Sequence, residues 1–151
     1  MGQRYVVSRE NATPTAAQDI LTLISAASRR IRLVSVNVRG AGTSSAQQGL
    51  QIAMNPTGTT PGGAIVPSKA EHTEQPAATF TTSTTWAVQP ALATNFDVLG
   101  WNALGGVNRW TTPPGRPNGS FEARNGDVIS IRAPTGPTYQ AISISCIVEE
   151  D

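Results

Sequence analysis

The ten residues of Arg30–Arg39 constrain the fold of this chain more than any other stretch. β-Branched residues dominate it, and apolar and polar side chains alternate along it as they do in a strand with one buried face. The alternation changes phase partway, because Ile31 and Leu33 are odd-numbered whereas the three valines that follow are even-numbered. One face can take all five apolar side chains if an extra residue is inserted near Leu33-Val34, which predicts a β-bulge there. The alternative is a strand whose first half is covered on both faces, as in a chain packed against a neighbouring subunit.

Further stretches along the chain also have the composition or the alternation of strands. They are Gln47–Asn55, Thr94–Leu104, Val107–Trp110, Val128–Arg132 and Tyr139–Val148. The small-residue loop Gly40–Ala46 separates the first of these from the opening strand, and Gly105-Gly106 separates the second from the third. Short connections of this kind predict two β-hairpins.

The segment Asp19–Ser25 is compatible with two secondary structures. As a helix it would use Thr13 as N-cap and Pro14 at the first helical position, with Ile20 and Ile24 on one stripe. As a strand it would place alternate apolar residues on its two faces. We favour the strand, because the neighbouring segments are strands.

Loops rich in proline and glycine separate these segments. Pro56–Ala70 and Thr112–Gly119 each hold three prolines, and Asn125-Gly126 is a tight-turn signature. Eight or nine short strands with turns between them and no clear helix predict an all-β protein, a single-domain antiparallel β-sandwich. A jelly roll is the type that best accommodates long loops between regular strands. We expect the sandwich to span residues 12–151, preceded by a short N-terminal arm at residues 1–11. The alternative for Gln3–Arg9 is an edge strand.

Composition limits the function classes. The chain has 151 residues, 14% charged residues and a formal charge of +1, which argues against the concentrated basic face of a nucleic-acid-binding protein. The single cysteine, Cys146, excludes an internal disulfide and suits synthesis in a reducing cytoplasm. No apolar run approaches the length of a membrane span, and the first residues do not resemble an export signal. We therefore expect neither a nucleic-acid nor a membrane partner.

The residues with reactive side chains do not form a recognisable catalytic, metal or cofactor motif. His72, the one histidine, lies in a polar loop beside Glu71 and Glu74, where a solvated role is expected, because a structural metal site needs about four ligands. Cys146 occupies an inward position of the last strand, where a small buried hydrophobe is expected. The remaining carboxylates are scattered. We expect a protein without enzymatic activity, metal or cofactor.

Three tryptophans stand out among only eight aromatic residues: Trp86, Trp101 and Trp110. Flat indoles could line a carbohydrate-binding face. The other interpretation is packing in the core or at a subunit interface, where an indole buries a large area. We favour packing, most of all for Trp101.

The order of features along the chain is similar to that of a known group of proteins. The Asp19–Leu23 strand leads to the Arg30–Val36 strand, followed by the Gly58–Pro67 loop, the Trp110–Pro114 segment, Asn125-Gly126-Asp127 and a closing strand that ends in Val148-Glu149-Glu150. This order resembles the jelly-roll capsid decoration, or cement, proteins and other minor virion proteins of tailed bacteriophages. The resemblance implies a homotrimer on the outer surface of the virion head that bridges major capsid proteins. It supplies no set of residues that can be carried over one by one.

The expected partners are therefore the major capsid protein and further copies of this chain. An arm carrying Tyr5, Val6, Val7 and Arg9 would pair with a neighbour by strand addition. The other candidate interaction residues are Trp86, Arg109, Trp110 and Arg116. The alternative function is a receptor- or carbohydrate-binding head of a tail fibre or spike, which would use Trp86 or Trp110 and the two long loops. A tail or neck subunit is a third option.

Overall fold

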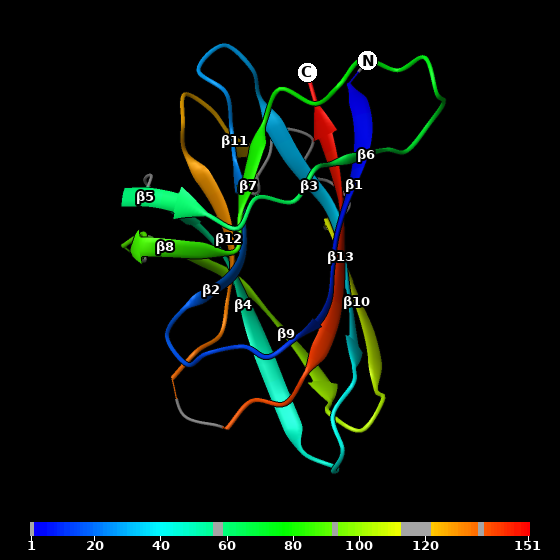
Figure 1. Cartoon of the computed structure of the whole chain (residues 1–151), viewed down its shortest axis with the longest axis vertical. Coiled ribbons are helices and arrows are strands. Elements are labelled where there is room, and N and C mark those ends of the chain that lie inside the picture. The colour runs from blue at the N-terminus through cyan, green and yellow to red at the C-terminus, as the bar shows by residue number, and fades with distance from the viewer. Residues whose placement is uncertain (1, 56–58, 92–93, 113–121, 136–137) are drawn as a thin grey trace.

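In the computed structural model, every regular element among the described residues is a β-strand, and the strand pairs are antiparallel. The structure describes residues 2–55, 59–91, 94–112, 122–135 and 138–151. The all-β prediction is confirmed. Two sheets lie on opposite sides of one core, and a short two-stranded sheet projects beside the second of them (Figure 1).

The first sheet, sheet A, has the strand order β10-β3-β13-β1-β6, with β11 also pairing with β3. Its strands are β1 (Gln3–Ala12), β3 (Ile31–Gly40), β6 (Ser68–Lys69), β10 (Val107–Thr111), β11 (Glu122–Ala123) and β13 (Ile142–Glu150). The second sheet, sheet B, has the order β7-β2-β12-β4-β9. Its strands are β2 (Asp19–Ile24), β4 (Gln47–Asn55), β7 (Thr81–Ser83), β9 (Thr94–Asn102) and β12 (Val128–Arg132). The short pair consists of β5 (Thr59–Gly62) and β8 (Thr85–Val88).

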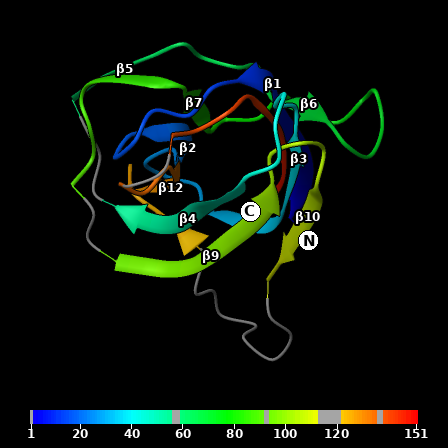
Figure 2. The same ribbon diagram turned by 90° about the horizontal axis from the view of Figure 1, so that it is seen from below.

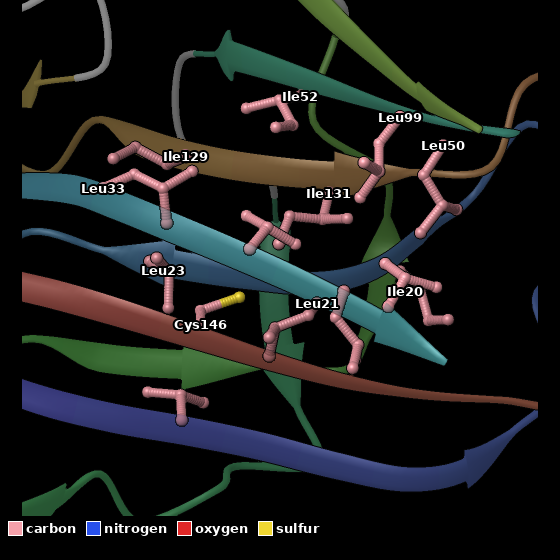
Figure 3. Close-up of a cluster of buried hydrophobic side chains, with 14 of the residues drawn as sticks. Ile20, Leu21, Leu23, Leu33, Leu50, Ile52, Leu99, Ile129, Ile131 and Cys146 are labelled. Atoms are coloured by element: carbon pink, nitrogen blue, oxygen red, sulfur yellow. The ribbon is translucent and has the colours of Figure 1, made fainter. Parts of the chain in front are cut away.

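The inward side chains of both sheets form a single hydrophobic core. Leucine and isoleucine from β2, β3, β4, β9 and β12 interleave there, and the sulfur of Cys146 on β13 lies among them (Figure 3). Leu21, Leu33 and Ile52 are fully buried, as is Cys146. A core of this size is the main source of stability for the fold, because each buried side chain contributes about 1.5–3 kcal/mol.

The predicted bulge in β3 is confirmed at Val34. Along the ladder with β13, Ile147 pairs with Ser35 and Val148 pairs with Leu33, so Val34 is the extra residue. Leu33 is buried before the bulge and Val36 is buried after it, on the same side of the sheet, whereas Val34 is half-buried. The bulge thus restores one buried face to a strand whose sequence changes phase.

The segment that was ambiguous between helix and strand is strand β2. Four consecutive residues, Ile20 to Leu23, are buried in it. Strand β7 pairs with β2, β8 contacts it, and the buried Thr22 Oγ1 donates to the backbone oxygen of Ser83. A strand covered on both faces reads as a continuous apolar run rather than an alternation, which explains the ambiguity.

Neither predicted hairpin forms. The strand before Gly40–Ala46 lies in sheet A and the strand after it in sheet B, and the connection at Gly105-Gly106 likewise leads from β9 in sheet B to β10 in sheet A (Figure 2). Side chains, not a strand ladder, join β9 to β10: Asn108 Nδ2 donates to the Gly100 oxygen. These connections therefore turn the corners of the sandwich.

Most of the segment predicted as an N-terminal arm, residues 1–11, belongs to strand β1 of sheet A, which begins at Gln3. Strand β1 pairs along its length with β13 and, at Tyr5 and Val6, with β6. Tyr5 and Val7 point into the core of their own chain and are fully buried. The apolar side chains that suggested contact with a neighbour therefore find their partners within the domain.

Candidate interaction surface

The residues proposed from the sequence as contacts divide into buried and accessible ones. Tyr5 and Val7 are core residues, and Val6 lies half-buried on the outer face of sheet A. Arg109 is exposed on β10. Arg116 lies outside the described residues.

Arg9 has a structural role. Its side chain follows the inward phase of β1, and its Nη1 donates a hydrogen bond to the backbone oxygen of Ile20 on β2. This hydrogen bond links sheet A to sheet B. It lies past the part of β1 that pairs with β6 and past the part of β2 that pairs with β7. Burial lowers the pKa of Arg9. An inward-pointing charge on a partly unpaired strand is a recognised protection against unwanted strand addition.

The tryptophans are packed rather than displayed. Trp86, Trp101 and Trp110 are all buried. The Nε1 of Trp110 on β10 donates to Asp97 Oδ2 on β9 at 2.6 Å, across the corner between the sheets. An indole that stacks on a sugar must present its face, so this arrangement does not favour the carbohydrate-binding alternative.

Cys146 and His72 differ in their surroundings. Burial of Cys146 raises the pKa of its thiol to about 12, so the thiol stays protonated. His72 is exposed in the loop between β6 and β7. Within the described ranges, no group of three or more His, Cys, Asp or Glu side chains could hold a metal ion.

One buried carboxylate lies on the far side of sheet B from the core. Asp19 accepts a hydrogen bond from Ser130 Oγ at 3.0 Å, and Ser130 in turn accepts one from Asn55 Nδ2. Arg132 Nη1 lies 3.6 Å from Asp19 Oδ1. Burial nevertheless raises the pKa of Asp19, since the loss of water outweighs the hydrogen bond from Ser130 and the charge of Arg132.

This raised pKa predicts a specific pH dependence. The folded chain keeps Asp19 protonated to a pH above its ordinary pKa of 3.8, whereas the unfolded chain releases this proton near that pH. The contribution of Asp19 to stability therefore falls as pH rises from about 3.8 through the folded pKa. We expect Asp19→Asn to remove that fall. Urea unfolding of both proteins between pH 3 and pH 7 would measure the difference between their unfolding free energies. That difference should move in favour of the variant with rising pH, by at most about 1.4 kcal/mol for each pH unit. A constant difference between the two proteins would contradict the role given to Asp19.

At one end of sheet A, the charged side chains of its outer face form ion pairs with one another. Arg4, Glu149, Arg32 and Glu122 lie directly opposite one another on β1, β13, β3 and β11. The ion pairs at this end are Arg4–Glu149, Arg32–Glu149, Arg32–Glu122, Arg30–Glu122, Arg124–Glu122 and Arg30–Asp151. The charges of this ladder form their ion pairs within the chain. Each exposed ion pair contributes only about 0–1 kcal/mol to the stability of the fold.

The other end of the same face is different. Arg39 on β3 lies directly opposite Val107 on β10, and Arg109 lies directly opposite Asn37. Val107 is 71% exposed, and Leu104, in the connection before β10, is 58% exposed. We call Arg39, Leu104, Val107 and Arg109 the β10 patch. It adjoins a shallow depression of about 190 Å³ whose lining includes Ser8, Ser143, Ser145 and Glu10.

Sequence reasoning found Arg109 but missed the other three members of the β10 patch. A signal was present, because Val107 and Arg109 occupy alternate positions of one short strand and therefore share a face. That this face is exposed depends on Trp110 being the inward residue. The described residues contain no helix that could span a membrane. No family model, curated protein or solved structure matches the chain.

Proposed function

We propose that this chain is a structural protein of a tailed-bacteriophage virion, a jelly-roll decoration protein that binds the outside of the head and stabilises the lattice of major capsid proteins. The strand order is the observation that supports the jelly-roll part of the proposal, and the resemblance in the order of sequence features supports the virion part. The eight long strands in chain order are β1, β2, β3, β4, β9, β10, β12 and β13. Counted from first to eighth, sheet A has the order 6-3-8-1 and sheet B the order 2-7-4-5.

This order supports the jelly-roll assignment. A jelly roll packs eight antiparallel strands into two sheets of four by two Greek keys, so the first and last strands become neighbours. Here β1 and β13 are neighbours in sheet A, as are β2 and β12 in sheet B. The strand order supports the fold alone; the resemblance in the order of sequence features is what points to virion proteins of this fold.

The buried carboxylates serve the fold, since Glu150 and Asp19 have hydrogen-bond partners within the domain. The depression beside the β10 patch is shallow, and three serines are among its lining residues. Surfaces of this shape suit contact with another protein. As a trimer, the chain would combine several modest contacts with the head into tight binding, because linked contacts gain in effective concentration.

The test is co-sedimentation of the purified chain with expanded, undecorated heads of the phage that encodes it. We expect saturable binding and a higher fraction of intact particles after heating than with buffer alone. Light scattering of the free chain gives the oligomer, for which a trimer is expected. Failure to sediment with heads, or binding without any gain in thermal survival, would contradict the decoration function.

A further inference from the structure

The arginines that project from the outer face of sheet A, or that pair with its carboxylates, fall into two groups. Arg4, Arg30, Arg32 and Arg124 pair with carboxylates in the charge ladder. Across the described ranges, the guanidinium groups of Arg39 and Arg109 make neither a hydrogen bond nor an ion pair. Ion pairs within the chain therefore account for the arginines of the first group, whereas no contact of this kind accounts for Arg39 and Arg109 in the part of the chain that the structure describes.

The unpaired cations flank exposed apolar surface. Val107 lies across the ladder from Arg39 and two residues from Arg109 on the same face of β10. Its side chain is among the most exposed of the large apolar groups, and so is that of Leu104. The connection between β9 and β10 lies at the opposite end of the molecule from both termini, and therefore from the charge ladder that includes Asp151 (Figure 1).

From this arrangement we infer that the β10 patch is the docking surface for an acidic protein surface on the phage head, an inference that rests on the function proposed above. Charge complementarity identifies the partner. Guanidinium groups bind carboxylates through paired hydrogen bonds, and they tolerate loss of water better than ammonium groups do. Arginine is enriched and other charges are depleted at the centres of protein interfaces. A partner with carboxylates around an apolar side chain would satisfy both arginines and cover Val107.

The same chemistry disfavours a nucleic acid as the occupant. Binding to a phosphate backbone draws on many cations along a groove. The patch supplies two, and the carboxylate of Glu10 borders the adjoining depression. The depression is shallow where the small side chains of Ser8, Ser143 and Ser145 line it, and a folded protein surface could therefore lie across this part of sheet A.

The experiment compares charge-reversal variants in the head-binding assay. Arg109→Glu and Arg39→Glu are the test variants, and Arg29→Glu is the matched control, because Arg29 is exposed and lies outside the β10 patch. We expect each test variant to weaken binding by about 10-fold or more, as for a charged contact at the centre of an interface. The control is expected to remain within about two-fold of the wild type, since long-range steering by one charge is screened by salt.

A second pair of variants tests the apolar part of the patch. Val107→Ser should weaken head binding several-fold, whereas Val66→Ser, at a site 86% exposed and outside the patch, should not. Thermal unfolding and light scattering of every variant show whether the fold and the oligomer are retained.

The outcomes separate this inference from the proposed function. If the wild type binds heads and the test variants bind equally well, the patch is not the docking surface and the decoration function stands. If the wild type does not bind heads, the decoration function fails and the docking inference with it. If the test variants change the oligomer but not head binding, the patch joins copies of this chain, which also overturns the inference.

Discussion

A chain that lacks residues 1–10 is expected to be unfolded. The deletion removes most of β1, which pairs with β13 from Gln3 to Ala12 and lies between β13 and β6. It also removes the fully buried Tyr5 and Val7 from the core. The Tyr5 hydroxyl lies within hydrogen-bonding distance of Gln3 Oε1 at 2.9 Å and of the Pro76 backbone oxygen at 3.0 Å, and its ring meets Phe80 edge-on at 5.7 Å between ring centroids.

The expected cost is comparable with the whole stability of the domain. Two fully buried side chains contribute about 1.5–3 kcal/mol each by transfer alone, and the deletion also exposes the inward residues of β13 and leaves its backbone unpaired. Domains of this kind are stable by about 5–15 kcal/mol in total. Far-UV circular dichroism and thermal unfolding would measure the loss. Removing residues 1–2, which precede β1, is the control and should leave the transition almost unchanged.

The contrasting result would restore the arm hypothesis. If the chain without residues 1–10 melted cooperatively near the wild-type temperature, β1 could not be a required strand of sheet A. Its apolar residues would then be free to pair with a neighbouring subunit. The experiment therefore decides between a strand of the domain and an arm that serves assembly.

Glu150→Ala is expected to lower the free energy of unfolding by about 3 kcal/mol. Glu150 lies at the end of β13, and its carboxylate accepts hydrogen bonds from the Thr79 backbone N at 3.1 Å, the Phe80 backbone N at 3.0 Å and the Thr79 hydroxyl. It thereby holds the segment that leads into β7 of sheet B against the end of sheet A. Alanine would leave the buried Phe80 N–H without its acceptor, which costs about 1–3 kcal/mol, and the exposed Thr79 would lose its hydrogen bonds to a charged acceptor, which adds to that cost.

The neighbouring glutamate is the matched control. Glu149 points to the outer face of sheet A and pairs with Arg4 and Arg32 near solvent, so Glu149→Ala should cost under about 1 kcal/mol. Glu150→Gln keeps one acceptor oxygen and should fall between the two. In a chain of this length, a loss of about 3 kcal/mol corresponds to a fall in Tm of about 6–12 °C. Equal effects of the two alanine variants would show that Glu150 does not join the sheets as described.

The positions of the strands could be predicted directly from the alternation of side chains in the sequence. The phase change between Leu33 and Val34 located the bulge in β3, because the side-chain alternation of a strand is a local property. The pairing of strands could not be read in the same way. Both short connections predicted as hairpins run between sheets instead, since a short glycine-rich loop can close a hairpin or turn a corner, and the choice depends on where the remaining strands pack.

The candidate surface shows the same division between local and long-range information. Arg32 and Arg39 lie on one strand and both project from the outer face of sheet A. Glu149 and Glu122 approach Arg32 from β13 and β11, whereas Arg39 lies opposite Ser143 and Val107. One guanidinium is therefore neutralised by carboxylates of the chain, whereas the other has no ion pair among the described residues. Nothing in the sequence around either arginine distinguishes them.

By itself, the sequence of this protein determined that the chain is all-β, where most of its strands lie and where β3 must bulge, because these depend on residues a few positions apart. The tertiary structure alone decided that β1 is a strand of sheet A and that, among the described residues, Arg39 and Arg109 have no ion pair. Those properties depend on contacts between residues that are distant in sequence, such as Arg32 and Glu149, 117 positions apart, and local side-chain patterns carry no record of them.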